Sequence, residues 1–231
     1  MHALLFAAGE GRRMRPLTQI LPKPLIEVGG VPMAVRQILA LRKAGITEIV
    51  VNAAHGARIL MAELGDGRSW GVKLLWSIEG FTAEDALETR GGIVRALPLL
   101  GSDPFIAVAG DIVTDFDYST LVRRARTLSA GGSLAHLVLV PNPGFHARGD
   151  FGLADGKVCR TGEKFTFSSL ALYHPAMFEG LPDERAKLFP WMNEWIDRGQ
   201  VSGELYRGRW ANVGTPEELS RAEALFAGDP A

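Results

Sequence analysis

Hydrophobic positions in the first half of the chain follow an alternating strand and helix pattern. Continuous apolar runs, typical of parallel strands buried on both faces, occupy residues 2–7, 48–52, 72–77 and 104–111. Segments with apolar residues at helical spacing occupy residues 33–44, 57–64 and 91–100. We expect the last of these helices to be interrupted near Pro98. The pattern predicts an α/β fold, a Rossmann-like mixed and mainly parallel sheet with helices on both faces.

The pattern changes after about residue 132. Strands are predicted, with less helix between them, over residues 133–140, 150–158, 165–174 and 201–210. Amphipathic helices are predicted over residues 188–199 and 216–227, and the aromatic residues of the first are expected in the core. We interpret the chain as a single domain, 1–231. Its first half, 1–131, holds the main ligand-binding edge, and its second half, 132–231, extends the sheet and builds one wall of a cleft.

Composition narrows the class of protein. The 25 basic and 26 acidic residues nearly balance, so no basic surface for nucleic acid is indicated. The only cysteine is Cys159, which excludes a disulfide framework and a cysteine zinc cluster. No apolar run has the length of a signal peptide or a membrane span. We expect a cytoplasmic protein with no nucleic-acid or membrane partner, as a monomer or small homo-oligomer.

The strongest chemical signal lies in residues 7–24, which read AAGEGRRMRPLTQILPKP. Gly9 and Gly11 let backbone N–H groups approach a phosphate without an intervening side chain. Positive charge for a triphosphate is supplied by Arg12, Arg13 and Arg15. Lys23 can reach a second phosphate, and the prolines on either side of it fix its backbone. The segment therefore indicates a polyphosphate-binding loop.

Three other interpretations of this loop were weighed. A dinucleotide-binding fingerprint needs a third glycine where Met14 stands, and a P-loop needs a Gly-Lys-Ser/Thr sequence that is absent. An ordinary loop without a ligand is the third alternative. The combination of glycines, arginines and Pro-Lys-Pro after an N-terminal strand favours phosphate binding.

Asp111 ends the apolar run at 104–111, at the edge of the sheet where ligands bind. A carboxylate there is costly unless it is solvated, paired or bound to a cation. Magnesium takes one or two carboxylates together with phosphate oxygens. Asp111 is therefore a candidate magnesium ligand.

The loop resembles the signature of the sugar nucleotidyltransferase family, which has a Gly-rich loop, an arginine, Pro-Leu-Thr and then Pro-Lys-Pro-Leu. The resemblance continues in LETRGG (87–92), AGD (109–111) and WANVGTPEEL (210–219). It implies the nucleotide-diphospho-sugar transferase type of fold, Mg²⁺ as the cofactor, and a nucleoside triphosphate and a sugar 1-phosphate as substrates. The segment 141–151, PNPGFHARGDF, is similar to the branch that joins UTP to N-acetylmuramic acid 1-phosphate.

The resemblance also implies roles for individual residues. Arg13 corresponds to the arginine that contacts the triphosphate and the departing pyrophosphate, and Lys23 to the lysine that holds the α-phosphate. The implied metal ligands are Asp111 and Asn212. The implied nucleotide-binding residues are Ala8, Gly9, Gly11, Glu79 and Thr89. The implied sugar-binding residues are Asn142, Arg148 and Asp150, with Arg148 meeting either the sugar phosphate or the carboxylate.

The chain departs from the family pattern at two places. Asn212 stands where many relatives have aspartate, and an amide oxygen can also ligate magnesium. The stretch before LETRGG is longer than usual and Arg90 replaces a small residue, so we expect a rearranged base loop. Other substrate pairs stay open, such as GTP with mannose 1-phosphate or CTP with a phospho-alcohol. So does a catalytically silent nucleotide-sugar sensor.

Overall fold

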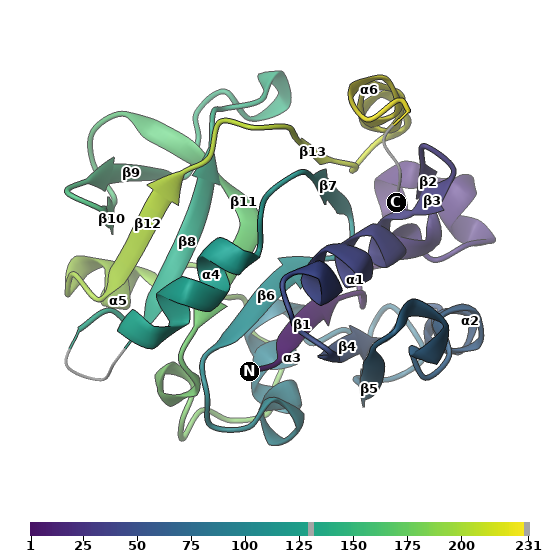
Figure 1. Ribbon diagram of the computed structural model, residues 1–231, viewed down its shortest axis with the longest axis horizontal. Helices are drawn as coiled ribbons and strands as arrows, with labels where there is room; N and C mark the ends of the chain where they lie inside the picture. Colours follow the sequence, from purple (N-terminus) through teal and green to yellow (C-terminus); the bar gives the residue numbers. More distant parts are fainter. Residues whose placement is uncertain (129–131, 229–231) are drawn as a thin grey trace.

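One mixed sheet joins both halves of the chain (Figure 1). The computed structural model describes residues 1–128 and 132–228, and in these residues the sheet has nine strands in the order β5-β4-β1-β6-β11-β8-β12-β10-β9. The strands of the first half are β1 (Ala3–Phe6), β4 (Glu48–Ala53), β5 (Lys73–Ile78) and β6 (Phe105–Ala109). They are parallel to one another, as their continuous apolar runs predicted.

The second half continues the sheet with mostly antiparallel pairing. Its strands are β8 (Ala135–Val140), β9 (Phe151–Ala154), β10 (Lys157–Cys159), β11 (Lys164–Tyr173) and β12 (Val201–Leu205). β11 lies antiparallel between β6 and β8 and so connects the two halves. The prediction of single strands over 150–158 and 201–210 was wrong. A turn at Asp155 and Gly156, both with positive φ, divides the first into β9 and β10.

The segment predicted over 201–210 is also divided, because its C-terminal end leaves the main sheet. Residues beyond β12 cross to form β13 (Trp210–Asn212), which pairs antiparallel with β7 (Ile112–Thr114) in a small separate sheet. β7 directly follows the end of β6, so this pairing brings the C-terminal part of the chain to the carboxyl edge of the parallel strands.

Helices cover both faces of the sheet, as predicted (Figure 1). They are α1 (Met33–Lys43), α2 (Ala57–Leu64), α3 (Glu88–Leu100), α4 (Ser119–Arg124), α5 (Asn193–Asp197) and α6 (Pro216–Leu225). Leu5 of β1 packs in one core cluster with Ile38 of α1, whereas its neighbour Leu4 packs in another with Ile93 of α3. Successive strand residues point to opposite faces, so α1 and α3 lie on opposite sides of the sheet.

Two helices differ from their predicted extents. α3 continues through Pro98, which lies in its last turn, so the predicted interruption was wrong. The helix predicted over 188–199 is reduced to α5. No helix in the described ranges has the length and apolar composition needed to cross a lipid bilayer.

A third core cluster fixes the N-terminal loop against the C-terminal part of the chain. The hairpin of β2 (Glu27–Val28) and β3 (Val31–Pro32) packs beneath α6. Met14 and Val28 lie in this cluster together with Val213 and Phe226. Their burial holds the segment after β13 beside the Gly-rich loop.

Candidate functional site

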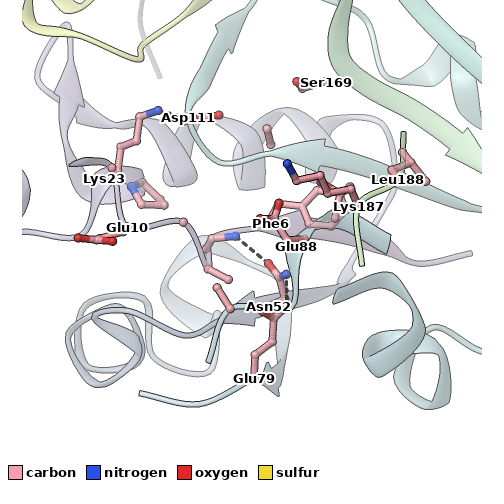
Figure 2. Close-up of a pocket in the computed structure, with 18 of the residues that line it drawn as sticks. Phe6, Glu10, Lys23, Asn52, Glu79, Glu88, Asp111, Ser169, Lys187 and Leu188 are labelled. Atoms are coloured by element: carbon pink, nitrogen blue, oxygen red, sulfur yellow. Dashed lines mark hydrogen bonds and ion pairs between the residues drawn. The ribbon is translucent and has the colours of Figure 1, made fainter. Parts of the chain in front are cut away.

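A cavity of about 740 Å³ opens at the carboxyl ends of β1, β4, β5 and β6 (Figure 2). Ligands of open α/β sheets bind at this edge. Of the twelve residues to which the resemblance gave a role, eight line it, namely Ala8, Gly9, Gly11, Lys23, Glu79, Thr89, Asp111 and Asn212. The other four, Arg13, Asn142, Arg148 and Asp150, are not among its lining residues.

The Gly-rich loop leaves β1 and enters the short 3₁₀ helix η1 (Arg12–Met14) at Gly11. Gly11 has φ of 68°, and a Cβ atom there would lie 2.9 Å from Cγ2 of Thr18 and 3.2 Å from Cβ of Lys23. Thr18 donates a hydrogen bond of 2.9 Å to the Gly11 carbonyl. Only glycine satisfies both the backbone conformation and the close approach of Lys23.

The three arginines of the loop do not converge on the cavity. Arg12 lines it but donates to Glu10 at 2.5 Å, and Arg15 donates to the other oxygen of Glu10 at 2.6 Å. The hydrogen bond from Arg12 is the main reason that the pKa of Glu10 lies below its ordinary value. Arg13 lies outside the lining, with Nη2 2.8 Å from the position a Cβ atom would take at Gly214.

Lys23 and Asp111 form the charged centre of the cavity. Lys23 begins the 3₁₀ helix η3 (Lys23–Leu25), and only 8% of Lys23 is exposed to solvent. Its Nζ donates to Oδ2 of Asp111 at 2.5 Å. Asp111 lies in the segment that follows β6. The ammonium neutralises a carboxylate that the end of an apolar strand would otherwise leave unpaired. The pair presents a fixed cation and a carboxylate to any phosphate in the cavity.

Asn212 lies beside this pair because β13 pairs with β7. Asn212 is opposite Ile112 in the register, and Val213 N–H donates to the Asp111 carbonyl at 2.9 Å. Among the described residues, no group of three or more His, Cys, Asp or Glu side chains could hold a metal. One carboxylate and one amide oxygen match the small protein ligand set of magnesium, which keeps water and phosphate oxygens as its other ligands.

A chain of buried hydrogen bonds connects the Gly-rich loop to the loop after β5 (Figure 2). Ala7 N–H donates to Oδ1 of Asn52 at 2.8 Å, and Nδ2 of Asn52 donates to Oε1 of Glu79 at 2.6 Å. The other oxygen of Glu79 accepts from Leu87 N–H at 2.7 Å. Burial raises the pKa of Glu79, while these hydrogen bonds act to lower it. Glu79 therefore uses both oxygens to position the surrounding loops.

Asn52 was missed in the sequence because it reads as the last polar residue of an apolar strand. The adjacent glycines Gly91 and Gly92 of α3 are the sequence feature that could have indicated Asn52. A Cβ atom at Gly92 would lie 2.6 Å from Oε1 of Glu79 and 2.7 Å from Nδ2 of Asn52. A helical glycine at this position marks the close approach of another polar group.

Arg90 is not among the residues that line the cavity. Its Nη2 lies 3.7 Å from Oε1 of Glu184, and its guanidinium lies 5.7 Å from the centre of the Trp191 ring. The longer stretch before it is closed by Asp85, which accepts from Phe81 N–H and from the N–H and hydroxyl of Thr82. The loop is thus ordered by its own contacts, and Arg90 does not obstruct the nucleotide end of the cavity.

The structure does not bring the predicted sugar-binding residues into the cavity. Asn142 donates to the carbonyls of Lys164 and Ala147, at 2.8 and 3.3 Å, and accepts from the Thr166 hydroxyl at 2.9 Å. These bonds hold its own loop. Arg148 is exposed.

Asp150, like Asn142, uses its polar atoms to hold the 141–151 loop and β11. Its Oδ2 accepts from Phe167 N–H at 2.8 Å, and its Oδ1 lies 2.9 Å from Nε2 of His146. Asp150 lines a second cavity, which has Phe189 in common with the main one. The polar groups of the 141–151 loop thus organise the edge of β11.

The second half contributes a different wall, made of β11 and the segment before α5. Its lining residues are Phe167, Ser169, Tyr173, Arg185, Lys187, Leu188 and Phe189. Ser169 has φ of 62°, at a point where the pairing of β11 with β8 shifts register. Phe189, one of the aromatic residues of 188–199, packs against a core cluster as predicted and also lines the cavity, where its ring meets that of Phe167 edge-on.

Comparisons with known proteins agree with this geometry. The sequence profile of the nucleotidyl transferase family matches residues 2–155. The chain is 42% identical over 230 residues to the N-acetylmuramate alpha-1-phosphate uridylyltransferase of Neisseria meningitidis serogroup B, which covers 97% of this chain and 98% of that protein. It is 34% identical over 242 residues to a mannose-1-phosphate guanyltransferase of Candida albicans. That match covers 98% of this chain but 64% of the guanyltransferase.

Solved structures share the fold at lower identity. A putative glucose-1-phosphate thymidylyltransferase from Bacillus anthracis superposes with a TM-score of 0.85 at 20% identity, covering 100% of this chain and 97% of that one. HddC from Yersinia pseudotuberculosis, complexed with GMP-PN, superposes with a TM-score of 0.78 at 18% identity, covering 97% of this chain and 99% of that one. The profile match and the near full-length relative show that the chain belongs to the nucleotidyl transferase family, as a sugar-1-phosphate nucleotidyltransferase.

Proposed function

We propose that the protein transfers a uridylyl group from UTP to N-acetylmuramic acid α-1-phosphate, giving UDP-N-acetylmuramic acid and pyrophosphate. The name of the Neisseria relative, which matches nearly the whole chain, supports this pair of substrates. This reaction returns a cell-wall sugar to a nucleotide-activated form, and we place it in the cytoplasm.

The observation that carries the proposal is the Lys23–Asp111 pair at the carboxyl edge of the parallel strands, inside a cavity of about 740 Å³. A cavity of this size accommodates a nucleotide and a sugar together. A buried cation next to a carboxylate and an amide oxygen suits a polyphosphate substrate that arrives with its metal ion.

The proposed chemistry is one in-line displacement. An oxygen of the sugar phosphate attacks the α-phosphorus of UTP, and the bond to the β-phosphate oxygen breaks to release pyrophosphate. A phosphate monoester, with a second pKa of about 6, is already ionised at neutral pH, so the nucleophile needs no general base. Catalysis then consists of positioning and charge stabilisation.

Individual residues divide this work. Lys23 is held by its short bond to Asp111 and stabilises charge on the α-phosphate as the fifth oxygen approaches. Arg13, beside Gly214, meets the departing pyrophosphate at the outer end of the loop. Asp111 and Asn212 would hold magnesium, which supplies further positive charge to the phosphates.

The base is proposed to lie over Ala8, Gly9 and Gly11, against the loop that Glu79 ties to Leu87 and the first turn of α3 with Thr89. Since both Glu79 oxygens are engaged, we assign it to shaping the base pocket. The sugar is proposed to lie against the wall of the second half.

A second candidate is the transfer of a guanylyl group from GTP to mannose 1-phosphate. Guanyltransferases match 98% of this chain, at 26–34% identity, which favours this pair over other substrates. A silent nucleotide-sugar sensor is less well supported, because Lys23 and Asp111 both line the cavity and Arg90 does not.

A substrate panel tests the proposal. Pyrophosphate release would be measured with magnesium for UTP, dTTP, GTP, CTP and ATP against the 1-phosphates of N-acetylmuramic acid, N-acetylglucosamine, glucose and mannose. We expect the highest kcat/KM for UTP with the muramic sugar. A clear preference for GTP with mannose 1-phosphate would move the protein to the second candidate, and no turnover with any pair would favour the sensor.

A further inference from the structure

Four cationic side chains line the cavity in the part of the chain that the structure describes. Three of them lie within 4 Å of a carboxylate oxygen, namely Arg12 with Glu10, Lys23 with Asp111, and Arg185 with Glu88. The fourth is Lys187. Among the described residues, no carboxylate lies within ion-pairing distance of its ammonium.

The backbone at Lys187 is fixed on both sides. The preceding residue, Ala186, donates from its N–H to the Leu87 carbonyl at 2.9 Å, and its own carbonyl accepts from Arg90 N–H at 2.9 Å. The following residue, Leu188, is 3% exposed and packs in the core. This irregular segment is therefore anchored to the first turn of α3, and Lys187 extends from a rigid base.

The side chain of Lys187 points into the cavity (Figure 2). Its ammonium faces the interior from the wall of the second half, across from Lys23 and Asp111 on the opposite wall (Figure 2). The aromatic rings of Phe167 and Phe189 form part of the same wall. Lys187 is an exposed residue, and its ammonium has no carboxylate partner among the described residues, so it is ready to pair with an anion of the ligand.

The two walls divide the anions of the substrates between them. The triphosphate has Lys23 and the backbone of the Gly-rich loop on the first wall. The sugar 1-phosphate brings anions of its own to the second wall, where Arg185 is paired with Glu88 and Lys187 is not. We propose that Lys187 is a specificity-determining residue that binds an anionic group of the sugar 1-phosphate.

This inference rests on the proposed function and deepens it. Two groups of the proposed sugar substrate share the chemistry that Lys187 would recognise, the 1-phosphate and the lactyl carboxylate. N-acetylglucosamine 1-phosphate has the phosphate but lacks the carboxylate, so a comparison of the two sugars separates them.

The test is steady-state kinetics of Lys187→Met, which keeps the apolar stem and removes the charge. Lys157→Met is the matched control, since Lys157 is an exposed lysine of the same half whose Nζ donates to the Ser133 hydroxyl at 2.8 Å. Losing a charge-assisted hydrogen bond should raise KM for the sugar phosphate by roughly ten- to a hundredfold. KM for UTP and the melting temperature should stay close to those of the intact protein, and Lys187→Arg should recover most of the affinity.

The outcomes are distinct. A rise in KM for both sugar phosphates assigns Lys187 to the phosphate, and a rise for the muramic sugar alone assigns it to the carboxylate. An unchanged KM for every sugar phosphate in a folded Lys187→Met variant, or an equal rise in KM for UTP, would overturn the inference. If the intact protein turned over no sugar phosphate, the proposed function itself would have failed. Arg148→Ala should leave these KM values near normal. A large rise in KM for Arg148→Ala, with none for Lys187→Met, would assign binding of the sugar-phosphate anion to the 141–151 loop instead.

Discussion

The two walls of the cavity are built in different ways. The wall from the first half collects polar groups at the ends of parallel strands and holds them in preformed pairs, such as Lys23 with Asp111 and Asn52 with Glu79. The wall from the second half comes from an antiparallel strand and an irregular segment. It offers aromatic surface and the cation of Lys187.

The difference matches the two tasks of a nucleotidyltransferase. Charge that develops during phosphoryl transfer is best stabilised by groups already held in place, because they need not reorganise during the reaction. Selection among sugars depends instead on shape and on a few contacts. The first wall should therefore determine turnover, and the second should determine which sugar is used.

The largest effect is expected at the proposed metal ligand Asp111 on the first wall. Asp111→Ala should lower magnesium-dependent turnover by roughly a thousandfold, since several kcal/mol of charge stabilisation are lost. Asn212→Asp should keep or raise activity, because it adds a carboxylate. EDTA should abolish activity in the intact protein and magnesium should restore it. Near-normal magnesium-dependent turnover by Asp111→Ala would place the metal elsewhere.

Lys23→Met should lower turnover by roughly two to three orders of magnitude, the scale for losing one preorganised charge at a developing negative centre. Methionine is preferred to alanine here because the stem of Lys23 packs against Gly11. Lys73→Met, which removes a lysine from a surface pair with Glu48, is the control. Equal turnover of the two folded variants would remove Lys23 from the catalytic machinery.

Asn142→Ala should affect stability rather than sugar affinity. Removing its three partly solvated hydrogen bonds should lower the free energy of unfolding by about 1–2 kcal/mol. KM for the sugar phosphate should stay within about twofold of the intact value. Denaturant unfolding and kinetics on the same preparation check both. A large rise in KM without loss of stability would support the sugar contact that the resemblance implied.

The smallest effect is expected at Ser169, on the second wall. Its φ of 62° is a left-handed conformation that costs a residue with a Cβ atom about 1–2 kcal/mol. Ser169→Gly removes this cost but gains unfolded-state entropy, so the free energy of unfolding should rise by only about 0.5–1 kcal/mol. Thermal unfolding would measure the change, and a loss of stability would show that the serine side chain stabilises the bulge.

Sequence patterns were informative where a general rule relates a sequence pattern to a position in the fold. Continuous apolar runs predicted the parallel strands, and the rule that ligands bind at their carboxyl ends drew attention to the loop after residue 7 and to Asp111. Gly11 was predicted as a glycine that lets the backbone approach a phosphate, and the structure adds that a Cβ atom there would meet Thr18 and Lys23. Hydrophobic periodicity is a local property of the sequence, so the strands and helices that it indicates can be predicted without knowledge of tertiary contacts.

No comparable rule covers the second wall. The bulge at Ser169 and the anchoring of Ala186 to α3 depend on contacts between segments far apart in the chain. The 141–151 loop has the polar composition of a binding loop, yet Asn142 and Asp150 use their polar atoms on its own backbone and that of β11. Composition alone does not distinguish a residue that binds a ligand from one that holds a loop.

The most direct test of this division is a crystal structure of the protein with UDP-N-acetylmuramic acid and magnesium. The account predicts uracil beside the loop between Glu79 and Leu87, the diphosphate beside the Lys23–Asp111 pair, and the muramic sugar against Phe167 and Lys187. A product whose sugar contacts the 141–151 loop, with Lys187 directed to solvent, would contradict it.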